Sequence, residues 1–293
     1  MSEKRKILIH LDTDIHASVF DRVVAVDSGI DFLFTHSGVR PEHVVPMVHG
    51  AIFTRGNKDL HRTAIFLGGS DVAHGEAVLK AVQQAMIPKA GLQVSTMLDS
   101  NGCNTTAVAA VLAAEQHLKL STTTALVLGG TGPVGQRVAR ILARQGSKVL
   151  VGSRDLSKAQ QACDAILRKV PTGKVTAVAT ASSSDAPLAL QQAQLVVAAG
   201  AAGVVLLPEK MRKDYKNLKV VIDLNAVPPV GIEGVDPMDR GQERDGAICY
   251  GAIGVGNTKM KIHRLAVAKL FEANNTHLDA EEIYDLGKSL GKL

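Results

Sequence analysis

The stretch Thr124-Ala-Leu-Val-Leu-Gly-Gly-Thr-Gly-Pro-Val-Gly-Gln-Arg-Val-Ala-Arg140 decides the fold of this chain. Residues 125–128 form a short apolar run, which predicts a buried parallel strand. Gly130, Gly132 and Gly135 follow with the spacing G-x-G-x-x-G. Pro133 suits the first turn of a helix, where its missing N–H would have no helical partner. The stretch therefore predicts a strand, a tight turn and the N-terminus of a helix.

Such a turn is typical of a dinucleotide-binding site, because free N–H groups and the helix dipole attract a pyrophosphate. Gly130 would allow the turn, Gly132 would let the backbone approach the phosphates, and Gly135 would let helix and strand pack closely. An ordinary strand–helix–strand unit without a ligand is the alternative. The predicted cofactor contacts in the turn are Gly130, Thr131, Gly132, Pro133, Val134 and Gly135.

The residues after the next strand indicate which dinucleotide is bound. A Rossmann protein that selects NAD carries Asp or Glu there, whereas this chain has Gly152-Ser153-Arg154 after the strand at 148–151. A hydroxyl and a guanidinium suit a 2′-phosphate, so we expect NADP, with NAD as a weaker alternative. Lys158, Ala199, Gly200 and Asn225 complete the predicted cofactor set.

Composition limits the class of protein. The 293 residues are enough for two modest domains, and no apolar run approaches the ~18 residues of a membrane helix. Cys103, Cys163 and Cys249 have neither metal-ligand spacing nor a disulfide pattern, and no secretory segment opens the chain, so we expect a cytoplasmic protein without a membrane partner. The 33 basic and 28 acidic residues are dispersed and Trp is absent, which gives nucleic-acid binding little support.

Alternating strand and helix patterns predict an α/β fold with two domains. We expect an open α/β substrate domain over 1–119, completed by C-terminal helices within 257–293 that return to it. A Rossmann-type domain is expected over 120–256. Two helices are expected at 185–193 and from about 258 to 273, and residues 226–239 read as a long loop.

Polar residues follow two strands of the first domain, where ligands of open α/β sheets bind. Asp12, Thr13 and Asp14 end the first strand, and Asp99 begins the run that follows the fourth. Helix capping and turn formation are the alternative roles. The predicted substrate contacts are Asp12, Thr13, Asp14, Ser100, Asn101, Gly102 and Lys259.

Other catalytic classes find little support. The ten His residues include no pair spaced H-x-x-x-H, so no metal site is predicted. No G-x-S-x-G motif is present, which lowers the expectation of a hydrolase.

Longer blocks carry a family resemblance. Residues 52–56 (Ile-Phe-Thr-Arg-Gly), 97–102 (Met-Leu-Asp-Ser-Asn-Gly), 225–229 (Asn-Ala-Val-Pro-Pro) and 259–264 (Lys-Met-Lys-Ile-His-Arg) resemble the NADP-dependent methylene-tetrahydromethanopterin dehydrogenases of methylotrophic bacteria. The resemblance runs nearly end to end and includes the glycine turn. The family is similar in architecture to methylene-tetrahydrofolate dehydrogenases.

The resemblance implies hydride transfer from methylene-tetrahydromethanopterin, and in some relatives methylene-tetrahydrofolate, to NADP in one-carbon metabolism. It implies that Lys259 lies beside the pterin, and a homo-oligomer, a trimer or hexamer. Two nitrogens flank the reacting carbon and stabilise the product cation, so the enzyme needs no base and acts mainly by positioning. Asp99 is our candidate for a carboxylate that stabilises the developing positive charge, and Lys259 for a residue that orients the pterin.

Three alternatives remain open at this stage. The first is a dehydrogenase whose substrate is methylene-tetrahydrofolate. The second is a shikimate-type reductase, which would need a catalytic Lys–Asp pair that the sequence offers only as adjacent Lys58-Asp59. The third is a non-catalytic NADP-sensing module, which would need a partner surface or a DNA-binding element.

Overall fold

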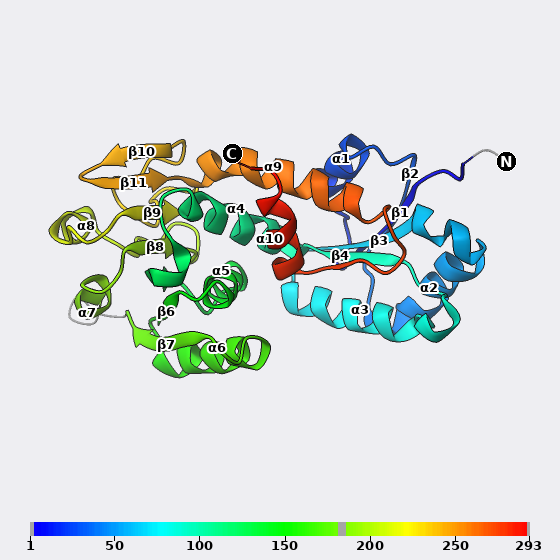
Figure 1. Cartoon of the computed structure of the whole chain (residues 1–293), viewed down its shortest axis with the longest axis horizontal. Coiled ribbons are helices and arrows are strands. Elements are labelled where there is room, and N and C mark those ends of the chain that lie inside the picture. The colour runs from blue at the N-terminus through cyan, green and yellow to red at the C-terminus, as the bar shows by residue number, and fades with distance from the viewer. Residues whose placement is uncertain (1–2, 181–185, 292–293) are drawn as a thin grey trace. The chain divides into compact units, whose positions relative to one another are not determined.

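The computed structural model describes residues 3–180 and 186–291 and divides into two compact units. Unit 1 comprises Met1–Thr105 and Met260–Gly287, and unit 2 comprises Thr106–Lys259 and Lys288–Leu293. Most of helix α4 (Cys103–Glu115), which the sequence assigned to the first domain, therefore belongs to unit 2. Each unit has its own parallel sheet flanked by helices, so the predicted two-domain α/β class is confirmed (Figure 1).

Unit 1 is built on a five-stranded sheet with the order β12-β4-β3-β1-β2, in which every pair is parallel. Its strands are β1 (Ile7–Asp12), β2 (Phe32–His36), β3 (Thr63–Gly68), β4 (Ser95–Leu98) and β12 (His277–Leu278). Its helices are α1 (Val19–Asp27), α2 (Val44–Phe53), α3 (Val72–Ala85), α10 (Ala280–Lys288) and the part of α9 (Ala252–Lys269) that follows Lys259.

The alternation of side chains along β1 separates two faces of this sheet. Ile9 and Leu11 pack with Val48 of α2 and Val78 of α3 in one apolar core. Leu8, His10 and Asp12 point to the opposite face, where α1 and α9 lie (Figure 1). His10 and Asp12 are therefore buried on the face opposite the apolar core formed with α2 and α3.

Unit 2 has a seven-stranded sheet with the order β10-β11-β9-β8-β5-β6-β7. All neighbours are parallel except β10 and β11, which form an antiparallel edge. The strands are β5 (Thr124–Leu128), β6 (Lys148–Ser153), β7 (Lys174–Ala179), β8 (Leu195–Ala198), β9 (Val220–Asp223), β10 (Arg240–Arg244) and β11 (Ala247–Tyr250). The remaining helices are α5 (Pro133–Arg144), α6 (Leu156–Lys169), α7 (Ala186–Leu190) and α8 (Glu209–Asp214).

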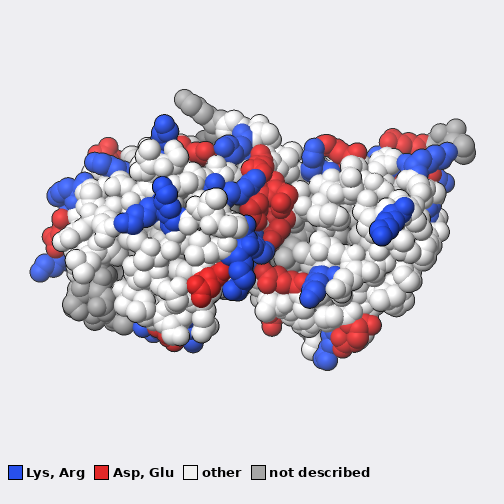
Figure 2. Space-filling model, turned by 60° about the horizontal axis from the view of Figure 1, so that its bottom comes forward, with Lys and Arg blue, Asp and Glu red and all other residues white. Residues whose placement is uncertain are grey.

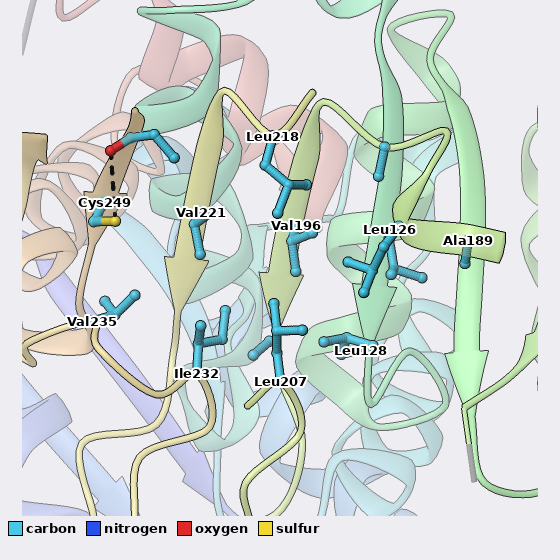
Figure 3. Packing of buried hydrophobic residues seen from close by; sticks show 14 of the residues in the cluster. Leu126, Leu128, Ala189, Val196, Leu207, Leu218, Val221, Ile232, Val235 and Cys249 are labelled. Atoms are coloured by element: carbon cyan, nitrogen blue, oxygen red, sulfur yellow. Dashed lines mark hydrogen bonds between the residues drawn. The ribbon is translucent and has the colours of Figure 1, made fainter. Parts of the chain in front are cut away.

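The central strands β5, β8 and β9 are almost uninterrupted apolar runs and are fully or nearly fully buried, as expected where helices cover a parallel sheet. Leu126, Val196 and Val221 come from three neighbouring strands and pack together in one core (Figure 3). Cys249 lies at the edge of this core, and its Sγ lies 3.8 Å from the carbonyl oxygen of Ala247.

Two expectations about helices need correction. Helix α9 begins at Ala252 instead of about residue 258, and α7 ends at Leu190 instead of 193. Residue 185, the expected start of α7, lies outside the described residues.

The charge distribution on the surface and the polarity of the helices relate to the expectation of a protein without a nucleic-acid or membrane partner. Lys and Arg are interspersed with Asp and Glu over the face shown in Figure 2, in agreement with a net charge of only +5. Across residues 3–180 and 186–291, the structure contains no helix with the length and apolar character needed to cross a membrane.

Candidate functional site

A cavity of about 520 Å³ lies at the carboxyl ends of β5, β6 and β8 in unit 2. Strand order reverses between β5 and β8, and such a switch point is where open α/β sheets bind ligands. The volume lies within the range of about 300–1,000 Å³ that is typical of small-molecule sites. The cavity is lined by Leu128, Gly129, Thr131, Gly132, Pro133, Ser153, Arg154, Asp155, Lys158, Thr180, Ala199, Gly200, Ala201, Val204, Val205 and Leu206.

The glycine turn gives this cavity a backbone-lined wall. Helix α5 begins at Pro133, and Gly132 precedes it without any side-chain cap, so the N–H groups of its first turn are available to an anion. A Cβ at Gly135 would lie 2.5 Å from the Gly129 carbonyl oxygen, which confirms its predicted role in close packing.

The left-handed residue of the turn lies one position before Gly130. Gly129 adopts the left-handed conformation instead, with φ of 69°, and a Cβ there would lie 2.5 Å from Cα of Gly200. Gly130 is required for a different reason, because its Cβ would lie 2.7 Å from Cγ1 of Val151. The G-x-G-x-x-G spacing begins at Gly130, so the sequence interpretation assigned no separate role to Gly129, the residue that follows the apolar run.

The polar side of the cavity contains the residues expected to recognise a 2′-phosphate. Ser153 ends β6, and exposed Arg154 and Lys158 follow it on the rim. Asp155 is the nearest carboxylate, and its Oδ1 accepts the backbone N–H of Lys158 at 3.1 Å as the N-cap of α6. Two cations and a hydroxyl therefore border the cavity, while this carboxylate caps a helix.

Four predicted cofactor residues do not line the cavity. Gly130 lies in the turn, and Val134 and Gly135 lie in the first turn of α5, but none of the three lines the cavity. Asn225 is buried, its Oδ1 accepts the N–H of Val227, and its Nδ2 donates to the carbonyl oxygen of Pro229. In the described structure Asn225 therefore organises the loop that follows β9.

In unit 1 the loops after β1 and β3 are tied together at one sheet edge. The Asp12 carboxylate accepts the N–H groups of Asp14 and Ser18 at 2.8 and 2.9 Å. The Asp14 carboxylate accepts the N–H and the hydroxyl of Ser70 at 3.0 and 2.9 Å. Thr13 packs so closely that a side chain at Gly69 would collide with its hydroxyl.

The loop after β4 joins the same edge. The N–H of Asn101 donates to the carbonyl oxygen of Gly69 at 2.7 Å, and buried Ser100 donates its hydroxyl to the carbonyl oxygen of Gly68 at 3.2 Å. Asn101 and Gly102 are left-handed, with φ of 53° and 58°. The predicted substrate residues Asp12, Thr13, Asp14, Ser100, Asn101 and Gly102 thus share one edge, and their contact with a substrate stays a prediction.

Asp99 has a clear structural task. Its side chain is fully buried, and Oδ1 accepts the N–H groups of Asn104 and Thr105 at 2.9 and 3.0 Å. Its Oδ2 accepts the Thr105 hydroxyl at 2.7 Å and lies 3.8 Å from Nδ1 of His263. Asp99 therefore caps the start of α4, and its catalytic role stays a prediction.

Beneath these loops lies a group of ionisable side chains that the sequence interpretation missed. His10 and Asp12 of β1 and Asp21 of α1 are all buried. Burial lowers the pKa of His10 to about 4, so its imidazole is uncharged at neutral pH. Burial also raises the pKa of the Asp21 carboxyl to about 6, and nearby Asp99 contributes to that rise. His10 and Asp12, two residues apart on one strand, were the available signal.

Lys259, the remaining predicted catalytic residue, lies in α9 and is half-buried. It is the last residue of this segment of unit 2 before the chain continues in unit 1 at Met260. Its proximity to a substrate stays a prediction.

Family models match both halves of the chain. Residues 19–101 match the N-terminal domain of methylene-tetrahydromethanopterin dehydrogenase. Residues 125–227 match a family described as NADP oxidoreductase, coenzyme F420-dependent. The second match covers the glycine turn and most of the cavity lining.

Curated relatives and a solved structure extend the comparison. The bifunctional protein MdtA of Methylorubrum extorquens is 43% identical over 288 residues, which cover 98% of this chain and 99% of MdtA. The NAD(P)-dependent methylenetetrahydromethanopterin dehydrogenase of the same organism is 30% identical, and the match covers 95% of this chain and 97% of that enzyme. Shikimate 5-dehydrogenase of Listeria monocytogenes, solved with shikimate and NAD, is 14% identical with a TM-score of 0.56 over 96% of each chain, so it shares the fold.

Identity above 40% over nearly the full length, with both domains matched in order, is decisive for the family. The chain belongs to the methylene-tetrahydromethanopterin dehydrogenase family of NAD(P)-dependent oxidoreductases.

Proposed function

We propose that this enzyme oxidises methylene-tetrahydromethanopterin to the methenyl form with NADP as the hydride acceptor. The observation that carries the proposal is the 520 Å³ cavity at the β5–β8 switch point, because it combines an uncapped helix N-terminus with a rim of Ser153, Arg154 and Lys158. The relative named as an NAD(P)-dependent methylenetetrahydromethanopterin dehydrogenase supports the choice of substrate.

The residues of the cavity fit NADP. The backbone at Gly132 is open, since a Cβ there would meet only carbonyl oxygens at 3.4 and 3.6 Å, and pyrophosphate can approach the first turn of α5. Arg154 and Lys158 would bind the 2′-phosphate through charge-assisted hydrogen bonds. The apolar residues Val204, Val205 and Leu206 would exclude water from the rest of the cofactor.

The bound nicotinamide supplies the reaction with an acceptor for two electrons and one hydrogen. The carbon that loses this hydride lies between two nitrogens, whose lone pairs delocalise the resulting charge, so no side chain must remove a proton. We assign orientation of the pterin to Lys259, and stabilisation of the positive charge to Asp99. Because Asp99 is buried as a helix cap, we expect it to act through the field of its carboxylate without touching the substrate.

Turnover with purified pterins tests the proposal. Methylene-tetrahydromethanopterin and methylene-tetrahydrofolate are each mixed with NADP and with NAD, and methenyl formation is followed by absorbance. We expect the fastest turnover with NADP and the methanopterin. Faster turnover with tetrahydrofolate would assign the enzyme to the alternative pterin. No methenyl formation in any of the four mixtures, with NADPH binding intact, would favour a non-catalytic sensor.

Lys259→Ala tests the proposed positioning role. We expect a higher KM for the pterin and a lower kcat, with unchanged NADP binding, since the cavity does not include Lys259. Lys261→Ala, two residues along the same helix and facing a different side, is the matched control. Equal kinetics for wild type and Lys259→Ala would remove Lys259 from the mechanism.

A homo-oligomer completes the proposal. Val19, Val23 and Val26 of α1 are 66%, 54% and 59% exposed, and Phe32 and Phe34 of the edge strand β2 are 51% and 50% exposed. Exposed apolar side chains on α1 and on an edge strand without a second neighbour are typical of an association site.

Light scattering after size-exclusion chromatography tests the oligomer. Val23→Glu combined with Phe34→Lys should convert a trimer or hexamer to smaller species. Val45→Glu is the control, because Val45 is similarly exposed, at 48%, on α2. A wild-type monomer would contradict the proposal.

We also propose a cytoplasmic location. Cys103, Cys163 and Cys249 are buried and form no disulfide, which suits a reducing compartment. Fractionation of cells that express the native protein is the direct measurement.

A further inference from the structure

We propose that His10, Asp12 and Asp21 of unit 1 bind one divalent transition-metal ion, and that Zn²⁺ fits the donor set best. The three residues each offer one donor atom, and these atoms lie within 4.8 Å of one another. One imidazole nitrogen with carboxylate oxygens is a donor set that Zn²⁺ accepts, whereas Mg²⁺ and Ca²⁺ prefer oxygen ligands alone.

His10 is the observation that points to a ligand. Its side chain is 1% exposed, and neither Nδ1 nor Nε2 forms a hydrogen bond within the protein. Nε2 lies 3.4 Å from Oδ2 of Asp12 without a hydrogen bond between them. A buried polar group of this kind costs free energy unless a ligand binds it.

A small cradle at Gly68 adjoins the three donor atoms. A Cβ built at Gly68 would lie 2.6 Å from Nε2 of His10, 3.3 Å from Oδ2 of Asp21 and 3.4 Å from Oδ2 of Asp12. The absence of a side chain at this residue therefore leaves space that all three donors border.

The separation of the donors suits four-coordinate geometry. Metal–ligand distances of about 2.0–2.2 Å in a tetrahedral site place neighbouring ligand atoms about 3.3–3.6 Å apart. The distance of 3.4 Å between His10 Nε2 and Asp12 Oδ2 matches this value. The widest donor separation, at most 4.8 Å, would have to close by about 1 Å on binding.

Charge also favours a dication. Among the described residues, no lysine or arginine forms an ion pair with Asp12 or Asp21. Arg22 and His263 both influence His10 electrostatically, and the guanidinium of Arg22 donates to the carbonyl oxygens of Ala17 and Ser18. A bound M²⁺ ion would compensate the charge of the two buried carboxylates beside the neutral imidazole of His10.

The ion would join two consecutive elements, β1 and α1. Asp12 ends β1 and holds the loop to Ser18, while Asp21 lies in the first turn of α1. A shared ion would fix this loop, which contains the predicted substrate residues Thr13 and Asp14. None of the three donors lines the cavity of unit 2, so this inference does not depend on the proposed function.

Zinc binding to the full chain tests the proposal. Purified protein is treated with a chelator, dialysed and titrated with Zn²⁺ by calorimetry, and Co²⁺ is used in parallel because its visible absorption reports four-coordinate geometry. We expect one equivalent per chain, a raised Tm on Zn²⁺ addition, and intense Co²⁺ absorption.

Two ligand variants and one steric variant locate the site. Asp21→Asn keeps the shape of the side chain, and His10→Phe keeps a ring against Phe66, whose centroid lies 5.2 Å from that of His10. Gly68→Ala fills the cradle without removing a donor. Each should weaken Zn²⁺ binding at least tenfold, whereas Asp27→Asn, an exposed carboxylate on the same helix, should leave it unchanged.

Two results would overturn the proposal. The first is the absence of a stoichiometric site in the wild-type chain, which would leave a water molecule as the occupant. The second is binding that survives Asp21→Asn and Gly68→Ala in folded protein, which would place the ion on surface histidines.

Discussion

Gly129→Ala probes the packing that shapes the nucleotide cavity. Gly129 has φ of 69°, and an alanine pays roughly 1–2 kcal/mol to remain in that left-handed region. The new methyl would also lie 2.5 Å from Cα and 2.6 Å from N of Gly200. Both are backbone atoms that cannot rotate away, so overpacking adds roughly 1–3 kcal/mol. We expect unit 2 to lose roughly 2–5 kcal/mol of unfolding free energy, the sum of the two effects.

Urea unfolding followed by circular dichroism measures this change, since the chain has no Trp for fluorescence. Hydrogen exchange assigns the loss to β5 and β8. Gly50→Ala in α2 is the matched control, because its Cβ meets nothing within 4 Å and should stabilise the helix by about 0.5–1 kcal/mol. A Gly129→Ala chain with unchanged stability and NADP affinity would refute the packing argument.

Three further predictions address the sites and caps. Arg154→Ala should raise KM for NADP roughly 10- to 100-fold, as expected for loss of one charge-assisted hydrogen bond, while KM for NAD stays within about twofold; equal changes for both coenzymes would exclude a 2′-phosphate contact. Asp99→Asn should lower the free energy of unfolding by about 1–3 kcal/mol in a urea titration, because the charged acceptor of two N–H groups of α4 is lost. Unchanged stability would contradict the role of Asp99 as a helix cap. Asp71→Ala should lower the free energy of unfolding by about 1 kcal/mol in the same titration, since Asp71 accepts the N–H of His74 at the start of α3. A stability equal to wild type would show that water replaces the Asp71 side chain as the acceptor of this N–H.

The regular parts of the fold could be predicted from local patterns. Residues 125–128 are apolar and end in glycine, so both the strand β5 and the turn after it were expected. Ser18 caps the start of α1 in the same local way, because its hydroxyl accepts the N–H of Asp21 three residues later. These features depend on residues that are close in sequence.

Other elements depend on tertiary contacts that no local pattern reveals. Gly254 made the start of α9 read as a loop, but this glycine lets the helix pack against the backbone, where a Cβ would collide with the Asp239 carbonyl oxygen. Strand β10 is polar because it forms the sheet edge, and β12 has only two residues, so neither shows a strand pattern.

The same reasoning applies to the sites. The cavity residues Thr131, Gly132, Pro133, Ser153, Arg154 and Lys158 were found because a known turn fixes their spacing. Asn225 does not line the cavity, and its side chain bonds within its own loop, which its position after β9 did not reveal. The cluster of His10, Asp12 and Asp21 was missed because a search for closely spaced histidines cannot detect donors that a strand and a helix bring together.

The central claim is direct hydride transfer from the pterin methylene carbon to NADP. It is tested most directly with methylene-tetrahydromethanopterin deuterated at that carbon, followed by mass spectrometry of the reduced nucleotide. We predict that the hydrogen transferred from this carbon is found in NADPH. Each transfer of deuterium should give one deuterium per NADPH, and no deuterium should be released to water. Unlabelled NADPH, with the deuterium released to solvent, would contradict the account.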